Sequence, residues 1–236
     1  MTKKFLGIIP ARGGSKSIPL KNIKPLQGIP LIAYTIIEAL KSKYLDRIIV
    51  STDDARITKI AEEYGAEVPF LRPKELATDT SPTLPVIQHA LRYLESEEYI
   101  PDFVVLLQPT SPLREVKYID EAIKKILDTD ADTVITITES EIHPYWMRKL
   151  DGDRVKPFID TGEKSLRRQD LPEIYRLNGA VVVSKTETIL SGKDWQQQDI
   201  RGVIMEVIDS IDIDTPLDFY IAEKLMELKE KGKDRL

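Results

Sequence analysis

The chain has 236 residues, 42% of them hydrophobic, a formal net charge of −5, two histidines and no cysteine. This length allows one main domain with a sizeable core and a small appendage. The lack of cysteine excludes disulfides and thiolate metal sites, and two histidines leave little for a histidine-based zinc site, so any metal is expected on carboxylates.

The net negative charge argues against an electrostatic nucleic-acid binder, which needs a broad basic face. The sequence also has no apolar run of membrane-spanning length and no secretory segment at its start. We therefore expect a cytoplasmic protein that binds neither nucleic acid nor membrane.

Short apolar strands and helices alternate in the first part of the chain. The expected elements are a strand at Phe5–Pro10, a helix at Leu31–Leu40, a strand at Arg47–Thr52, a helix at Ala55–Tyr64 and a short strand at Glu67–Leu71. This order favours a mostly parallel sheet between two layers of helices, a three-layer α/β/α fold. Ligands of such sheets bind beyond the carboxyl ends of the strands.

The second part of the chain continues this pattern after an interruption. The expected elements are a helix ending near Leu94, a strand at Phe103–Leu107, a helix at Val116–Leu127, strands at Asp132–Thr138, Gly179–Ser184 and Val203–Ile208, and a helix at Pro216–Lys229. The interruption is richer in Arg, Lys, Pro and Asp. We therefore predict a core of residues 1–139 and 179–236 and an inserted arm of residues 140–178.

The turn after the first strand has the composition of a phosphate cradle. Glycines allow the backbone to approach an anion, and Arg12, Lys16 and Lys21 supply positive donors for polyphosphate oxygens. It is not a P-loop, because Pro10 and Ser15 occupy the glycine positions, and the dinucleotide pattern Gly-x-Gly-x-x-Gly is also absent. A surface loop with solvated cations is the alternative.

Residues 8–22 also resemble the first motif of the CMP-sialic acid synthetase (acylneuraminate cytidylyltransferase) family. That motif is an apolar strand followed by Ala-Arg, a variable pair, Ser-Lys and Pro-x-Lys-Asn. The resemblance implies a Rossmann-like nucleotidyltransferase fold with a small inserted dimerisation arm. It also implies a set of nucleotide-binding residues in this motif: Ala11, Arg12, Gly13, Ser15, Lys16, Lys21 and Asn22.

A pair of aspartates precedes the last predicted helix. Side chains alternate along an extended chain, so Asp212 and Asp214 point the same way and could hold a hard cation such as Mg²⁺ or Mn²⁺. Helix capping by Thr215, with Pro216 at the first helical position, explains part of this stretch without a metal. The resemblance favours the metal, because the family uses a similar Asp-x-Asp to hold the metal on the triphosphate.

Two polar loops carry further candidate binding residues. The turn that starts at Gln108 contains two prolines, which fix its side chains with little freedom. The resemblance implies that Gln108 contacts the sugar acid. The loop from Arg72 to Asp79 resembles the segment that reads the nucleobase and ribose in the family, and we assign Arg72, Ser81 and Thr83 to the nucleotide.

The arm ends in two segments that also resemble the family, Arg-Gln-x-x-Pro and Arg-x-Asn-Gly. The resemblance implies that Arg168, Arg176 and Asn178 bind the acidic sugar and that the arm reaches across a homodimer. A surface salt-bridge network is the alternative for its many cations. Val182 stands where some sialic acid enzymes have Tyr, which leaves a different nine-carbon acid open.

Taken together, the motifs imply a CMP-nonulosonic acid synthetase that transfers CMP from CTP to the anomeric hydroxyl of an acidic sugar and releases pyrophosphate. The residues expected to act in catalysis are Arg12, Lys16, Asp212 and Asp214. The open alternatives are legionaminic acid, pseudaminic acid or Kdo as the acid, another nucleoside triphosphate, and a nucleotide-binding module without turnover.

Overall fold

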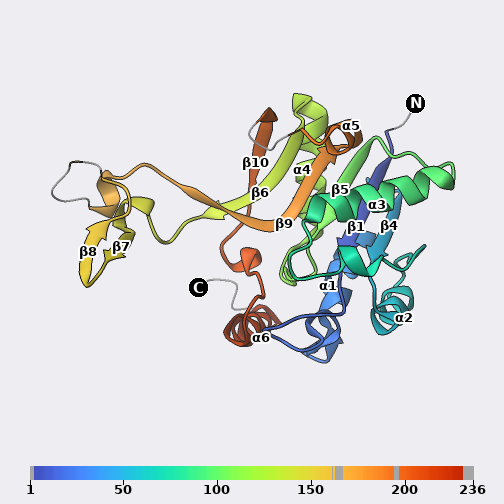
Figure 1. Cartoon of the computed structure of the whole chain (residues 1–236), viewed down its shortest axis with the longest axis horizontal. Coiled ribbons are helices and arrows are strands. Elements are labelled where there is room, and N and C mark those ends of the chain that lie inside the picture. The colour runs from blue at the N-terminus through green and yellow to red at the C-terminus, as the bar shows by residue number, and fades with distance from the viewer. Residues whose placement is uncertain (1–2, 161, 163–166, 194–196, 231–236) are drawn as a thin grey trace.

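The computed structural model describes residues 3–160, 162, 167–193 and 197–230. At its centre is a six-stranded sheet of order β10-β6-β9-β5-β1-β4, with helices on both faces (Figure 1). The strands are β1 (Phe5–Pro10), β4 (Arg47–Ser51), β5 (Phe103–Leu107), β6 (Thr133–Glu139), β9 (Tyr175–Lys185) and β10 (Ile200–Ile204). Only β9 runs antiparallel to its neighbours within this sheet, β5 and β6. The predicted three-layer α/β/α fold is confirmed.

Alternation of side chains along the central strands produces the two layers of helices. The helices are α1 (Leu31–Leu40), α2 (Ala55–Glu63), α3 (Thr83–Ser96), α4 (Val116–Thr129) and α5 (Thr186–Ser191). Phe5 and Ile9 of β1 pack with α1, α2 and α4, whereas Leu6 and Ile8 pack with α3 and α5. Each fully buried side chain of this kind contributes about 1.5–3 kcal/mol, so the sheet is fixed from both faces.

The last helix, α6 (Pro216–Glu230), packs outside these two layers, beside α1 (Figure 1). Its Phe219, Ala222 and Met226 share a separate apolar cluster with Ile18 and Leu31. The small hairpin of β2 (Pro25–Leu26) and β3 (Ile29–Pro30) adds Leu26 to the same cluster. This cluster joins the chain before α6 to the loop after β1. Within the described residues, no helix is both long and apolar enough to cross a membrane.

Two of the predicted strands are wrong. Residues 67–71 make only two isolated bridges, Ile49 with Glu67 and Thr52 with Leu71, because β4 is the edge strand and the segment touches it at its ends alone. The strand predicted at Val203–Ile208 is displaced: β10 ends at Ile204, where its pairing with β6 ends. The chain then forms a buried 3₁₀ turn, η6 (Ile208–Ser210), in which Asp209 accepts a 2.7 Å hydrogen bond from Tyr118.

Short 3₁₀ turns connect several of the other elements: η1 (Lys21–Ile23), η2 (Lys74–Leu76), η3 (Pro144–Trp146) and η4 (Arg168–Asp170).

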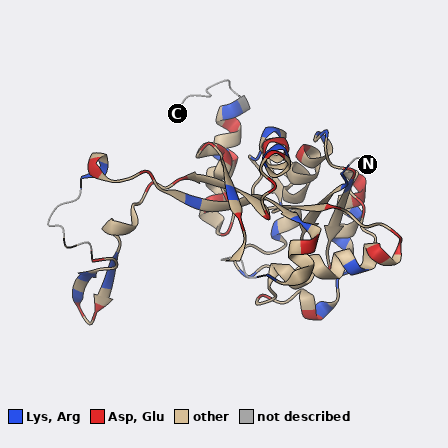
Figure 2. Ribbon diagram, turned by 90° about the horizontal axis from the view of Figure 1, so that it is seen from above, with Lys and Arg blue, Asp and Glu red and all other residues tan. Residues whose placement is uncertain are grey.

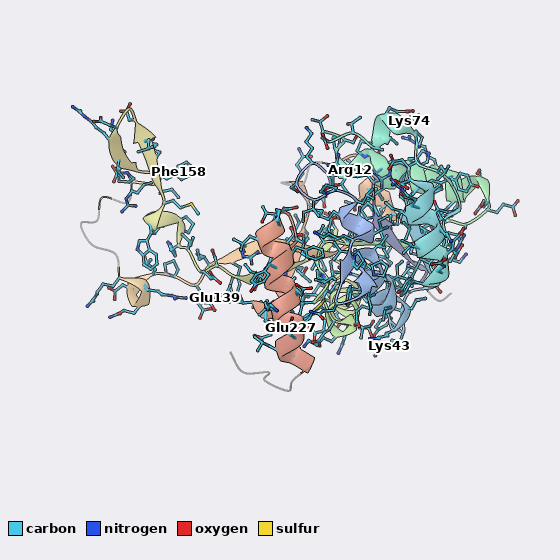
Figure 3. The ribbon with its side chains drawn as sticks, turned by 90° about the horizontal axis from the view of Figure 1, so that it is seen from below. Arg12, Lys43, Lys74, Glu139, Phe158 and Glu227 are labelled. Carbon is cyan, nitrogen blue, oxygen red and sulfur yellow. The ribbon has the colours of Figure 1, made fainter. Side chains whose placement is uncertain are left out.

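The segment between β6 and β9 extends far from the core (Figures 1 and 3), where Phe158 is well separated from Arg12. It carries a two-stranded hairpin, β7 (Arg148–Asp151) and β8 (Arg154–Pro157). The last four residues of the predicted arm, 175–178, belong to β9, which begins at Tyr175 and pairs with β6 from Glu139. Residues 161 and 163–166 of the predicted arm lie outside the described residues.

Candidate active site

A cleft of about 580 Å³ opens beyond the carboxyl ends of β1 and β5. Its lining brings together five distant parts of the chain: the loops after β1 and β5, the loop that leads into α3, Gly179 of β9, and the chain before α6. Most of the predicted site residues line it: Arg12, Ser15, Lys16, Lys21, Asn22, Arg72, Ser81, Thr83, Gln108, Asp212 and Asp214.

Two cations of the loop after β1 converge on one carboxylate inside the cleft. Arg12 and Lys16 each form a 2.7 Å ion pair with a different oxygen of Asp79. The hydrogen bond from Lys16 lowers the pKa of the Asp79 carboxyl below its ordinary value, and the charge of Arg12 adds to this effect. The two cations are therefore arranged to hold the oxygens of one anion, as a polyphosphate site requires.

The backbone of this loop is fixed from behind by residues of β4 and the turn after it. Gly13 donates its amide to Asp53 at 2.9 Å, and a Cβ at Gly13 would lie 2.6 Å from a carboxylate oxygen of Asp54. Ala11 is buried and donates to the Ser51 carbonyl at 2.9 Å. Ala11 and Gly13, predicted to contact the nucleotide, thus lie outside the cleft lining and shape the loop instead. Sequence reasoning missed Asp53 because this contact joins residues 40 positions apart.

The predicted metal-binding pair stands on the opposite wall, in direct contact with the same loop. Lys21 donates to the Ile213 carbonyl at 2.6 Å and lies 3.1 Å from the Asp214 carboxylate, and Ser17 donates to the Asp214 carbonyl at 2.5 Å. Enclosure of Asp212 by the cleft wall raises the pKa of its carboxyl, and the charge of Asp214 raises this pKa further. A hydrogen bond with Thr110 acts in the opposite direction.

Asp212 and Asp214 suit a magnesium ion shared with a substrate better than a metal ion held by protein ligands alone. The described residues contain no group of three or more His, Cys, Asp or Glu side chains placed to hold an ion. Mg²⁺ is commonly bound by one or two carboxylates, with substrate phosphates and waters completing its six ligands. Asp212 and Asp214 beside a cationic phosphate loop fit that pattern.

The helix-capping alternative also holds, for different residues. Thr215 donates its amide to Asp218 at 2.7 Å, and the Asp218 amide donates to the Thr215 hydroxyl at 3.3 Å. This reciprocal pair caps α6 without Asp212. Capping therefore explains Thr215 and Asp218, and leaves Asp212 in the cleft.

Arg72 and Ser81, predicted for the nucleotide, are partly engaged in fixing the cleft wall. The guanidinium of Arg72 is buried and donates to the Ser51 hydroxyl at 3.0 Å and to the Leu76 carbonyl at 3.5 Å. Burial lowers its pKa to about 10. Ser81 donates to the Glu75 carbonyl at 3.1 Å and accepts from the Thr78 amide at 3.1 Å.

Three residues predicted to bind the sugar are outside this cleft lining. Asn178 is buried, where it accepts from Thr136 at 2.7 Å and donates to Ser210 at 3.0 Å, so its side chain is used inside the protein. Arg168 pairs with Glu139 at 3.4 Å in the arm. Arg176 is exposed on β9. Within one chain, Gln108 is the predicted sugar residue that the cleft contains.

An apolar pocket of about 390 Å³ adjoins the cleft and was not predicted from the sequence. Thr83 lines both spaces, and Leu106 and Val182, paired across β5 and β9, lie a few residues from the cleft residues Gln108 and Gly179. The pocket is lined by Thr83, Leu84, Ile87, Val104, Leu106, Val182, Ser184, Thr188, Ile189, Gly192, Lys193 and Gln198. Of these residues, only Thr83 and Val182 are singled out in the predictions from the sequence.

Comparison with known proteins gives this arrangement a family. The sequence model described as Cytidylyltransferase matches residues 6–234. The chain belongs to the cytidylyltransferase family. It is a nucleotidyltransferase, and the resemblance seen in its motifs is confirmed.

Relatives of this cytidylyltransferase act on several acidic sugars. It is 38% identical to the CMP-N,N′-diacetyllegionaminic acid synthase of Legionella pneumophila, over 97% of this chain and 99% of that enzyme. It is 36% identical to the N-acylneuraminate cytidylyltransferase of Escherichia coli, over 99% of this chain and 54% of that longer enzyme.

A solved structure of CMP:2-keto-3-deoxy-manno-octonic acid synthetase complexed with CTP has the same fold. The TM-score is 0.74 at 15% identity, and the match covers 96% of this chain and all of the other, 100%.

Proposed function

We propose that this cytidylyltransferase transfers CMP from CTP to the anomeric hydroxyl of an N-acylated nonulosonic acid, with a di-N-acetylated acid of the legionaminic type as the first candidate. One observation carries the proposal: a cleft with clustered cations and paired carboxylates shares Thr83 with a neighbouring apolar pocket.

The charged end accounts for binding of the nucleotide. The triphosphate replaces Asp79 as the anion between Arg12 and Lys16, which then stabilise the negative charge that develops on the departing pyrophosphate. Asp212 and Asp214 would hold Mg²⁺ on the phosphates, and the bound metal would neutralise part of their charge. Arg72, Ser81 and Thr83 line the cleft and would form the wall beside the nucleoside.

The reaction itself is a displacement at the α-phosphorus. The anomeric oxygen forms the new bond to phosphorus, the bond to the bridging oxygen of the pyrophosphate breaks, and the hydroxyl proton leaves to solvent. The contribution of the protein is to align the two reactants and to stabilise the charge of the leaving group.

The apolar end accounts for the choice of acid. Gln108 and Gly179 line the cleft, and Leu106 and Val182, a few residues away, line the apolar pocket. An acceptor beside Gln108 and Gly179 would place its acyl group toward Leu106 and Val182. An acylamido group presents a methyl that gains from burial on such a surface, whereas Kdo has no acyl group to place there. The similarity to the CMP-N,N′-diacetyllegionaminic acid synthase of Legionella pneumophila supports this choice.

The arm supports a homodimer. Leu150, Val155 and Phe158 are 73%, 66% and 61% exposed on a hairpin with only two strands, and an isolated hairpin of that size is marginally stable in water. Lys and Arg also line this hairpin (Figure 2). In a dimer the partner subunit would cover these apolar side chains, and the arm would bring Arg168 toward the partner's site. Light scattering should give a mass near twice 26.9 kDa, and a monomer at working concentration would contradict this part.

Pyrophosphate release tests the proposal. Purified protein with Mg²⁺ is combined with CTP, GTP or UTP and with N,N′-diacetyllegionaminic, pseudaminic, N-acetylneuraminic acid or Kdo. We expect release with CTP and the acylated acids, fastest with the diacetylated legionaminic acid. Preference for Kdo or for another nucleotide would contradict the proposal, and so would CTP binding without turnover of any acid.

A further inference from the structure

The most deeply buried cation of the described residues lies beneath the cleft and does not touch its surface. Arg114, in the turn between β5 and α4, is 1% exposed and is the largest fully buried side chain of the described residues. It is absent from the cleft lining. A guanidinium is costly to bury, and burial lowers the pKa of Arg114 to about 10 despite the nearby charge of Glu38.

The side chain of Arg114 donates to two backbone carbonyls, one just after β5 and one within β9. Its Nη1 donates to the Gln108 carbonyl at 3.0 Å and to the Ala180 carbonyl at 2.8 Å. Nε and Nη2 have no hydrogen-bond partner among the described residues. A residue selected for stability alone would not leave two buried donors unsatisfied, since an apolar side chain of similar length costs less.

The two carbonyls that Arg114 joins belong to the acceptor side of the cleft. The paired register of β5 and β9 ends at Leu107 with Val181, so Gln108 and Ala180 lie just past the last sheet pair. Beside them β9 is irregular: Gly179 has a φ of +67°, and the register with β6 shifts between Ile135 and Ile137. The sheet therefore does not by itself fix Gln108 and Gly179, and Arg114 is the side chain that connects the two backbones.

We propose that Arg114 is a positioning residue that clamps the end of β5 to the middle of β9, so that Gln108 and Gly179 present a fixed surface to the acceptor. The proposal rests on the proposed function only for the identity of that acceptor. Thr35 assists the same clamp, because its hydroxyl donates to the Gln108 carbonyl at 3.3 Å from α1.

Arg114→Met tests the clamp, since it keeps the length and packing of the side chain and removes its donors. Amide exchange is measured by mass spectrometry without any acid present. We expect exchange to become about tenfold faster in peptides covering residues 107–111 and 178–182, and to stay unchanged in peptides covering the loop at residues 11–22. Unchanged exchange in both the 107–111 and the 178–182 peptides would overturn the proposal.

Kinetics then separate positioning from a general loss of structure. For Arg114→Met we expect kcat/KM for the acid to fall about 30- to 100-fold, the loss typical of a misplaced reactant. The Kd for CTP should stay within about threefold and the thermal midpoint should not fall, because a buried charge is often replaced without loss of stability. Equal losses for CTP and acid would overturn the proposal. A wild-type protein that uses no acid contradicts the proposed function instead, and the exchange experiment still decides on the clamp.

Two further variants guard against a protein that fails to fold. Thr35→Val removes the second donor to the Gln108 carbonyl with little change of volume, and we expect a smaller loss, again confined to the acid. If Arg114→Met does not fold, the absence of such a loss in Thr35→Val overturns the proposal. Arg114→Met is also combined with Gln108→Ala. In that background Arg114→Met should lower kcat/KM for the acid by less than it does alone, because both changes act on the contact between Gln108 and the acceptor.

Discussion

The two ends of the cleft are built in opposite ways. The nucleotide end consists of charged side chains on loops, such as Arg12, Lys16 and Asp212, which lie in short motifs of the sequence. The proposed acceptor end consists of apolar side chains from β5, β9, α3 and α5. Under the proposed function, nucleotide chemistry would reside in local motifs, while the choice of acid would reside in packing between distant segments.

The largest effect is expected at the charged end, from Asp212→Asn. The change keeps the shape of the side chain but removes the charge that holds the metal, so we expect kcat to fall by about 10²- to 10³-fold. Steady-state pyrophosphate release at saturating Mg²⁺ measures this. Asp128→Asn, at an exposed position of α4, is the control and should be fully active. Normal turnover by Asp212→Asn would remove the metal assignment.

The same variant has a predicted effect on stability with pH. The folded protein raises the pKa of Asp212, so the folded state favours the protonated carboxyl, and ionisation costs stability as pH rises through that pKa. Urea unfolding should therefore show that the free energy of unfolding of Asp212→Asn rises relative to that of the wild type between acid and neutral pH. A variant that loses stability over this range would contradict the assigned direction of the shift.

A smaller and more selective effect is expected at the apolar end, from Val182→Phe. The larger side chain fills the pocket, so we expect kcat/KM for the diacetylated acid to fall about 10- to 100-fold, the range for a misfit in an apolar pocket. The Kd for CTP should not change, because Val182 is absent from the nucleotide cleft. Leu190→Phe adds bulk at an exposed position outside the pocket and is the matched control.

The smallest effect is expected from Asp79→Asn. Removing the carboxylate that pairs with Arg12 and Lys16 takes away a competitor of the triphosphate, and ion pairs at exposed positions are individually weak. We therefore expect the KM for CTP to fall about threefold to tenfold, less at high salt. Glu75→Gln in the same loop is the control. A raised KM would show that Asp79 supports the nucleotide site instead.

Local pattern explains what the sequence predicted well. The alternation of apolar strands and helices gave the three-layer fold, and motif residues such as Lys16 and Asp214 do meet in one cleft. The misses depend on pairing that no local pattern records. Residues 67–71 look like a strand but have only an edge strand to touch, and the polar Asn178 is used inside the protein by Thr136 and Ser210.

The acceptor end shows the same limit more strongly. Leu106 and Val182 face each other only because β9 inserts antiparallel beside β5, a topology that alternation along the sequence does not reveal. In the sequence, Arg114 is part of a polar turn. Only the fold shows that its side chain is buried and joins the end of β5 to β9.

The crystal structure of the protein with CTP and N,N′-diacetyllegionaminic acid would test the central claim most directly. We predict the triphosphate between Arg12 and Lys16, with Asp79 displaced, and an acetyl methyl in contact with Leu106 and Val182. An acid bound with both acetyl groups in solvent, or a triphosphate away from Arg12, would contradict the account.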